Sequence, residues 1–260
     1  MTEPQDASST PASFAFHRVA ARAVYGVYVY AIFLALGLST VFAMIAPGLR
    51  RRRNIARNMS RVLFRFAGMR LVVKSAERVP EGQCVIVSNH ASYLDGVVFT
   101  AVLPPRFGFV IKREMERVPV AGVLLRRLGH EFVERFNRNR GGVDARRVLR
   151  TAVSGNSLVF FPEGTFAQVP GLGKFHSGAF TIAVRAGCPV VPAIIRGTRR
   201  ALPPKQTWPY PAEIEIEFLE PILPGGVTGE DAAVALRDRA RSAILDELKE
   251  PDLAAAKAAA

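Results

Sequence analysis

The sequence predicts an α/β fold in which a mixed, largely parallel sheet is flanked by helices and preceded by an N-terminal membrane-embedded helical segment. Two observations carry this prediction. From residue 71 onward, short apolar runs of strand character alternate with segments of helical periodicity, the order expected when strands and covering helices follow one another. Before that point, residues 23–49 carry no charged side chain.

Composition divides the chain into four parts. Residues 1–13 are polar and rich in Ser, Thr and Pro, which is typical of a disordered terminus. Residues 14–70 are expected to form membrane-anchoring helices, and residues 71–250 to form the α/β domain. The Ala-rich residues 251–260 are expected to form a flexible tail.

The uncharged segment 23–49 would extend about 40 Å as a helix, more than the ~30 Å of bilayer hydrocarbon. It is too long for the core of a signal peptide, and no convincing cleavage site follows it. The alternative is a buried core helix. Arg50 to Arg53 follow directly, and no acidic residue appears between Arg53 and Glu77. The positive-inside rule therefore places the rest of the chain in the cytoplasm, at the inner (cytoplasmic) membrane.

A second helix is expected over residues 55–69. Its apolar residues recur at helical spacing, and its opposite face carries Arg57, Arg61 and Arg65. A basic amphipathic helix of this kind suits an anionic membrane surface. The two segments together predict a hairpin that dips into one leaflet, and a single spanning helix is the simpler alternative.

The α/β part is expected to hold six strands, at residues 71–73, 84–87, 107–111, 158–161, 190–195 and 214–219. Helices are expected at residues 96–102, 144–154, 177–186 and 228–249, the last with Thr228 as its N-cap. A basic segment runs from residue 112 to 140. The two cysteines, Cys84 and Cys188, fall in apolar runs and are expected to be buried thiols rather than a disulfide. No metal-ligand spacing occurs, so no metal is expected.

The strand at 84–87 stops at a polar loop that delivers His90 and, five residues later, Asp95. A histidine whose ring is held by a carboxylate can act as a general base. If Asp95 accepts a hydrogen bond from Nδ1, the Nε2 atom is left to accept a proton from a substrate. The alternative is a histidine that caps a helix, with the aspartate in the first helical turn.

Three further stretches are candidates for a site. Residues 160–165 place Glu163 in a loop at a strand's end, where it could lie beside His90, bind an acceptor hydroxyl or form an ordinary turn. Residues 129–135 end in Arg135, which is suited to phosphate or is a solvated charge. Residues 191–197 form a strand with Pro192 at its start, which by itself indicates an edge or a bulge.

In this order, the four stretches resemble the lysophospholipid acyltransferase family, which includes 1-acylglycerol-3-phosphate acyltransferases. The chain matches the family's blocks N-H-x-x-x-x-D, G-x-x-F-x-x-R, F-P-E-G-T and V-P-x-x-x-x-G at residues 89–95, 129–135, 161–165 and 191–197. The resemblance implies that His90 is the general base and that Asp95 orients it. It also implies an acyl thioester donor, acyl-CoA or acyl carrier protein, and a lysophospholipid acceptor, with no cofactor or metal.

The resemblance further assigns acceptor binding to the second and third blocks, with Arg135 on the phosphate beside Glu163, Gly164 and Thr165. It associates Pro192 with the acyl donor. One position departs from the pattern: many members that use phosphate acceptors have Arg after the E-G-T triplet, and this chain has Phe166. Lys174 and Lys112 are the candidates to replace the missing cation. Otherwise the acceptor lacks a phosphomonoester, as in a lyso-aminolipid.

Two other function classes compete with the enzyme. The net charge of +13 suits a nucleic-acid-binding protein, but no helix-turn-helix, zinc or stacking-aromatic pattern accompanies it, so no nucleic-acid partner is expected. A catalytically silent lipid-binding relative is disfavoured by the intact His90, Asp95 and Glu163. His130 and His176 are expected to be structural or solvated, and Trp208 with Tyr210 to lie in an ordered loop or at the membrane interface.

Overall fold

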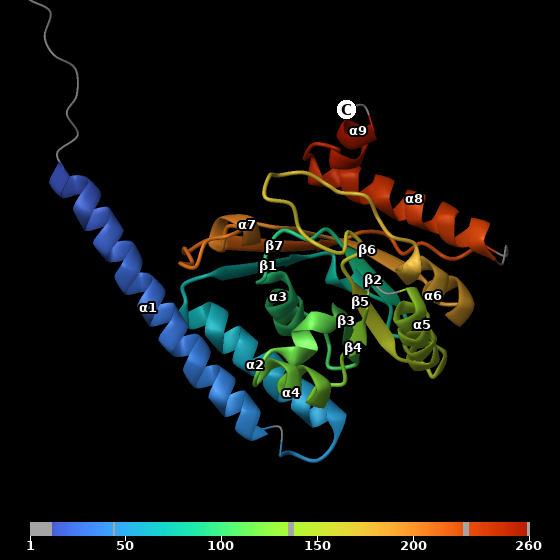
Figure 1. The fold of residues 1–260 in the computed structure, drawn as a ribbon, viewed down its shortest axis with the longest axis horizontal. Helices are drawn as coiled ribbons and strands as arrows, with labels where there is room; N and C mark the ends of the chain where they lie inside the picture. The colour runs from blue at the N-terminus through green and yellow to red at the C-terminus, as the bar shows by residue number, and fades with distance from the viewer. Residues whose placement is uncertain (1–11, 44, 135–137, 226–228, 259–260) are drawn as a thin grey trace, which may run out of the picture.

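A computed structural model describes residues 12–43, 45–134, 138–225 and 229–258. An α/β domain forms the body of the molecule, and one long helix, α1, lies along its side (Figure 1). The helices are α1 (Ala12–Ala43), α2 (Leu49–Phe66), α3 (Asp95–Val102), α4 (Ala121–Arg127), α5 (Arg138–Val153), α6 (Gly178–Ala186), α7 (Thr198–Ala201), α8 (Glu230–Leu248) and α9 (Leu253–Ala258). Two 3₁₀ turns are η1 (Ala76–Arg78) and η2 (Arg113–Arg117).

A seven-stranded sheet forms the centre of the domain, with the order β1-β7-β6-β2-β5-β3-β4. Its strands are β1 (Arg70–Lys74), β2 (Val85–Ser88), β3 (Phe107–Lys112), β4 (Glu131–Val133), β5 (Ser157–Phe160), β6 (Val190–Arg196) and β7 (Glu213–Phe218). Every neighbouring pair is parallel except β6 with β7. The predicted mixed, largely parallel sheet is therefore confirmed, and β4 is a strand that the sequence did not predict.

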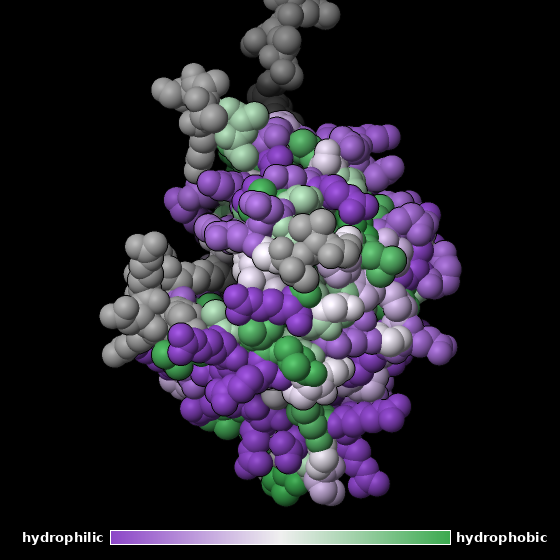
Figure 2. All heavy atoms as spheres, turned by 90° about the vertical axis from the view of Figure 1, so that its right-hand side faces the viewer, coloured by the Kyte–Doolittle hydropathy of each residue, from purple (hydrophilic) through white to green (hydrophobic). Residues whose placement is uncertain are grey.

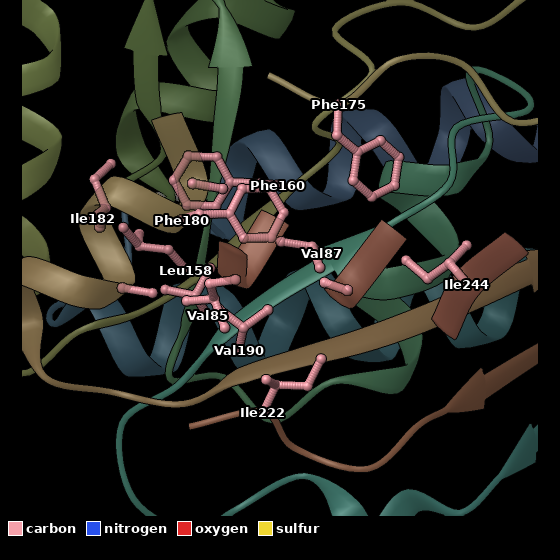
Figure 3. Packing of buried hydrophobic residues seen from close by; sticks show 14 of the residues in the cluster. Val85, Val87, Leu158, Phe160, Phe175, Phe180, Ile182, Val190, Ile222 and Ile244 are labelled. Carbon is pink, nitrogen blue, oxygen red and sulfur yellow. The ribbon is translucent and has the colours of Figure 1, made fainter. Parts of the chain in front are cut away.

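Both faces of the sheet are covered, which is why its central strands are continuous apolar runs. Along β2, Val85 and Val87 pack under α5, α6 and α8, whereas Cys84 and Ile86 pack against α2 and α3. Figure 3 shows the first of these clusters, where Phe180 of α6 and Ile244 of α8 meet the strand residues. Side chains alternate between the faces because a strand has a period of two residues.

The two cysteines are free and buried, as the sequence predicts. Burial in the apolar core raises the pKa of the Cys84 thiol to about 11, mainly because the thiolate would lose its water. Neither side chain is therefore a thiolate near neutral pH.

The N-terminal helices pack on each other as a hairpin. Tyr25 of α1 donates a hydrogen bond to the carbonyl of Ala67 at the end of α2, at 2.6 Å. Residues Ala20–Ser39 are long and apolar enough to cross a bilayer and are mostly exposed on the molecule. A loop between α7 and β7 holds the other side of α1: Arg22 lies 4.0 Å over the Tyr210 ring, and Trp208 packs so closely on Gly26 that a Cβ there would clash. Trp208 and Tyr210 thus belong to an ordered loop.

Part of the basic face that the sequence predicts for α2 contacts the domain, whereas Arg65 stays exposed. Arg53 is buried and donates to the carbonyls of Leu128 (2.8 Å) and Gly129 (3.0 Å). One and two turns later, Arg57 and Arg61 donate to carbonyls at the end of α3, those of Val102 and Ala101. Cations suit this position because the last carbonyls of a helix lack partners and carry partial negative charge. Three arginines therefore dock α2 onto the domain.

The C-terminal region also differs from expectation. Helix α8 begins at Glu230 after Gly229, and the predicted N-cap Thr228 lies outside the described residues. The expected flexible tail contains the short helix α9, and it is tied to the domain because Asp252 pairs with Arg241 of α8 at 2.5 Å. An Ala-rich composition alone does not reveal such an anchor.

The half-buried His130, which also lines the cavity described below, should make the protein sensitive to acid. Its Nδ1 accepts the Phe109 N–H at 3.2 Å, and burial together with the positive charge of Arg53 lowers its pKa to about 3. Between the unfolded-state pKa of about 6.5 and the folded-state pKa of about 3, the imidazole binds a proton only in the unfolded chain. The free energy of unfolding therefore decreases as the pH is lowered through this range, by up to about 1.4 kcal/mol per pH unit. The variant His130→Asn keeps a hydrogen-bond acceptor for the Phe109 N–H but has no group that takes up a proton in this pH range.

We therefore expect the free energy of unfolding in detergent, measured by denaturant titration at pH 7, 5.5 and 4, to fall more steeply for the wild type than for His130→Asn. Parallel curves for the two proteins would contradict an imidazole that stays neutral in the folded protein.

Candidate active site

The loop after β2 is fastened to the sheet by Asn89. Its buried side-chain amide donates to the carbonyl of Ile195 at 3.0 Å and accepts from the N–H of the same residue at 2.8 Å. Ile195 belongs to β6, the neighbour of β2. Asn89 therefore continues the ladder between the two strands by one step, and the following residue, His90, leaves the sheet at a fixed point.

Asp95 organises the rest of the loop. One carboxylate oxygen, Oδ2, accepts hydrogen bonds from His90 Nδ1 at 2.7 Å, from the Ala91 N–H at 2.7 Å and from the Ser92 N–H at 3.0 Å. The side chain is fully buried at the first residue of α3, where the helix dipole favours a negative charge. A carboxylate can only accept, so Nδ1 carries the proton and the Nε2 atom of His90 is the basic one.

Aromatic rings hold the imidazole from two sides. Phe161 stacks on His90 with centroids 4.5 Å apart, and Phe166 meets it edge-on at 4.9 Å. Phe166 also contacts the exposed ring of Tyr93 at 4.8 Å. The residue that replaces the expected arginine is thus a direct neighbour of His90.

Glu163 lies beside His90, as one of the sequence alternatives proposed. Its Oε1 accepts the His90 backbone N–H at 2.8 Å, and its Oε2 accepts the Gly173 N–H at 2.7 Å. The carboxyl group is buried, which raises its pKa, while the two hydrogen bonds act in the opposite direction. Both oxygens are engaged with backbone, so the arrangement supports a positioning role, and acceptor binding by Glu163 stays a prediction.

The C-terminal segment supports Glu163 from behind. Arg241 of α8 donates to the carbonyls of Gly173 (3.0 Å) and Leu172 (3.2 Å) and pairs with Asp252. Glu250 accepts the Gly171 N–H at 2.6 Å. The Arg241 guanidinium holds the pKa of Asp252 well below its usual range, at about 2. The loop that carries Gly173 is therefore fixed to α8 and to the end of the chain.

His90 opens into a cavity of about 630 Å³. Residues of α1, α2, α3, η2 and α4 line most of it with apolar side chains, among them Phe33, Met59, Val97, Met115 and Leu124. The polar end of the lining holds Gly164 and Thr165, with Phe166 beside them. Lys112 and Lys205 are the cationic lysines among the described lining residues.

The structure brings together only part of the predicted site. His90, Asp95, Glu163, Gly164 and Thr165 converge where β2 and β5 end, the position at which open α/β sheets bind ligands. Lys112 lines the cavity as proposed. Lys205, which comes from the loop that holds α1, had no motif or spacing to identify it.

Two predicted residues, Lys174 and Pro192, stand apart from the described lining of the cavity. Lys174 is exposed and lies outside the described lining. Pro192 is buried within β6, opposite Val87 of β2, and accepts the Leu219 N–H through its carbonyl at 2.8 Å. Its side chain is thus part of the sheet, and contact with a donor stays a prediction. Arg135 lies outside the described residues.

Comparisons with known proteins show which family the chain resembles. A family model described as acyltransferase matches residues 70–196. The 1-acyl-sn-glycerol-3-phosphate acyltransferase of Pseudomonas aeruginosa is 30% identical over 82% of this chain and 84% of its own length. The human 1-acyl-sn-glycerol-3-phosphate acyltransferase alpha is 31% identical over 70% of this chain and 65% of its own length.

Some relatives are matched over a smaller share of their own length. The chloroplastic 1-acyl-sn-glycerol-3-phosphate acyltransferase BAT2 of Brassica napus is 36% identical over 50% of this chain, which spans 38% of that protein. Among solved structures, the 1-acyl-sn-glycerophosphate acyltransferase PlsC of Thermotoga maritima superposes with a TM-score of 0.75 over 89% of this chain and 96% of its own, at 21% identity. At that identity the likeness shows the fold.

Glu163→Gln should destabilise the protein, because an amide accepts only one of the two backbone hydrogen bonds and presents its NH₂ to the other N–H. We expect a loss of about 1–3 kcal/mol in the free energy of unfolding, measured by denaturant titration in detergent. The matched control is Glu114→Gln at an exposed position of η2, which should stay within about 0.5 kcal/mol of the wild type. An equal loss in the two variants would show that Glu163 does not bridge the loops.

Proposed function

The chain belongs to the family of 1-acyl-sn-glycerol-3-phosphate acyltransferases, and from this premise we propose that it transfers a fatty acyl group from an acyl thioester to the free hydroxyl of a lysophospholipid. The favoured acceptor is 1-acylglycerol-3-phosphate, which would give phosphatidate. The observation that carries the proposal is the His90–Asp95 pair, 2.7 Å apart, at the polar end of a large apolar cavity.

His90 acts as the general base. Its Nε2 takes the proton of the acceptor hydroxyl while the oxygen attacks the thioester carbonyl, and the resulting tetrahedral intermediate expels the thiolate. The imidazolium then returns the proton to the thiolate, so the enzyme ends unchanged. Asp95 fixes the tautomer and stabilises the imidazolium in this cycle, as an aspartate does for the histidine of a catalytic triad.

The transfer proceeds directly rather than through an acyl-enzyme. Cysteine thiols are the most reactive nucleophiles that proteins offer at neutral pH, yet Cys84 and Cys188 are buried and burial raises the pKa of each. A thiolate is a good leaving group, so the proposed step needs neither a metal nor a cofactor. The donor is acyl-CoA or acyl carrier protein, and its fatty chain lies in the apolar part of the cavity.

The enzyme works at a membrane, with the α/β domain facing the cytoplasm. The apolar helix Ala20–Ser39 supports this location, as does the run of arginines at residues 50–53, which the positive-inside rule keeps on the cytoplasmic side. Substrate lipids then reach the cavity, which α1 itself lines, without leaving the membrane surface.

A second acceptor class is favoured by Phe166. Where related enzymes that use phosphate acceptors are expected to hold an arginine, this ring contacts His90 and Tyr93. Lys112 and Lys205 in the lining offer replacement cations for a phosphate. If they do not serve this purpose, the acceptor lacks a phosphomonoester, as in a lyso-aminolipid.

His90→Ala should abolish turnover. We expect thiol release from palmitoyl-CoA by the purified protein in detergent to require lysophosphatidate and to fall about 10²–10⁴-fold in the variant, because the general base is lost. His176→Ala at an exposed site is the control and should keep activity. Unchanged release in His90→Ala would refute general-base catalysis. Thiol release only with a lyso-aminolipid would establish the second acceptor class. If neither acceptor gives release, the assay is repeated with acyl carrier protein as the donor in place of CoA.

Phe166→Arg should shift acceptor preference toward phosphate. A charge-assisted hydrogen bond of about 1.5–3 kcal/mol corresponds to a rise of roughly 10- to 150-fold in the ratio of kcat/KM for lysophosphatidate over lyso-aminolipid. Phe166→Met is the matched control, since it removes the ring without adding a charge. The same ratio in the two variants would show that position 166 does not face the acceptor headgroup.

A further inference from the structure

We propose that the corner between η2 and α4, residues 117–123, is a second membrane contact that inserts beside α1 into an anionic lipid surface. The inference rests on the proposed membrane location of the chain but not on its catalytic activity. Nothing in the sequence pattern singled this corner out, because it lies in the basic segment for which no element was predicted.

The corner presents apolar side chains to the outside. Val118, Val120 and Val123 are 41%, 60% and 51% exposed, and Pro119 is exposed between them. A cluster of exposed apolar residues within one turn is unusual on a soluble surface and indicates an interaction site. The face of the molecule turned away from α1 is mostly hydrophilic, with scattered apolar residues (Figure 2).

The backbone holds these side chains outward. Val120 has φ 65° and ψ −56°, and the Ala121 N–H donates to the Pro119 carbonyl at 2.7 Å. This is a γ-turn with positive φ, a strained conformation that β-branched residues rarely adopt. Gly122 lies so close to the Glu116 carbonyl that a Cβ would come within 2.1 Å of its oxygen. The corner is therefore a rigid feature rather than an open loop.

The corner stands next to the membrane helices. Ala121, Leu124 and Leu125 of α4 line the same cavity as Phe33 and Leu36 of α1. Arg52 and Arg53 of α2 donate to the carbonyls of Arg127 and Leu128, at 3.3 and 2.8 Å. Figure 1 shows α4 at the end of the molecule where α1 turns into α2. Whatever surface receives α1 is thus within reach of the corner.

The charges around the corner select the lipid. Residues 112–127 carry Lys112, Arg113, Arg117, Arg126 and Arg127 against two acids, Glu114 and Glu116. Glu116 is paired with Arg113 at 3.4 Å and lies 3.6 Å from Arg126. Arg117 and Arg127 are exposed on either side of the valines. Apolar residues flanked by arginines match the acyl boundary and the anionic headgroups of a bilayer.

A fluorescent label tests the insertion in the full-length chain. One exposed cysteine is introduced in each of two variants, Val120→Cys and Val123→Cys, and position 123 has a helical backbone. The two native cysteines are buried and are not expected to react with the label. Each protein is labelled with an environment-sensitive fluorophore and placed in nanodiscs of phosphatidylcholine and phosphatidylglycerol. Quenching by lipids that carry a spin label on the acyl chain is then measured.

Two further labels make the outcomes distinct. Leu34→Cys on α1 is 63% exposed and reports membrane insertion of the anchor. Val153→Cys is also 63% exposed, but it lies on α5, which covers the other face of the sheet. We expect quenching at positions 34, 120 and 123 and none at 153.

Quenching at 34 but not at 120 or 123 would overturn the inference and leave the membrane location intact. The absence of quenching at positions 34, 120 and 123 alike would refute the membrane location itself. A label at 120 that responds to added acyl carrier protein and not to lipid would assign the corner to a protein partner, which also overturns the proposal. Far-UV circular dichroism of each labelled protein, compared with the wild type, confirms that it is folded.

Discussion

The site depends on one carboxylate oxygen. Asp95 Oδ2 accepts from two backbone N–H groups of the loop and from the ring of His90, so the interaction that folds the loop is also the one that makes Nε2 basic. Three donors to Oδ2 and the start of α3 offset part of the cost of burying this carboxylate, whose Oδ1 is buried without a hydrogen-bond partner among the described residues. Because one atom serves both purposes, the loop cannot fold in this way while leaving the imidazole in the wrong tautomer.

A second carboxylate extends this constraint across the domain. Glu163 connects the backbone of His90 to Gly173, and Arg241, Glu250 and Asp252 fix the Gly171–Gly173 turn to α8 and the chain's end. Each of these contacts spans at most 79 positions, and in series they link the backbone of His90 to residues as far along the chain as Asp252. The position of the base is therefore set by the packing of the C-terminal half as well as by its own loop.

The sequence predicted what depends on local pattern and missed what depends on long-range partners. Continuous apolar runs identified the buried strands, and the spacing of His90 and Asp95 identified their pairing. The arginines of α2 were read as membrane-facing because periodicity shows which side chains share a face, not which carbonyls they meet. Lys174 was proposed as a replacement cation because it follows a motif. Nothing in the sequence pointed to Lys205, whose position depends on how the loop before β7 packs against α1.

The docked arginines of α2 also explain how the cavity is built. Arg53, Arg57 and Arg61 turn the basic side of α2 onto the domain, which leaves Met59 and Leu63 of its apolar side to line the cavity with α1. Helices that were expected to serve only as an anchor therefore form a wall of the proposed site. A chain with its anchor removed would lose that wall and expose the apolar cavity to water, so anchoring and substrate binding are properties of the same helices.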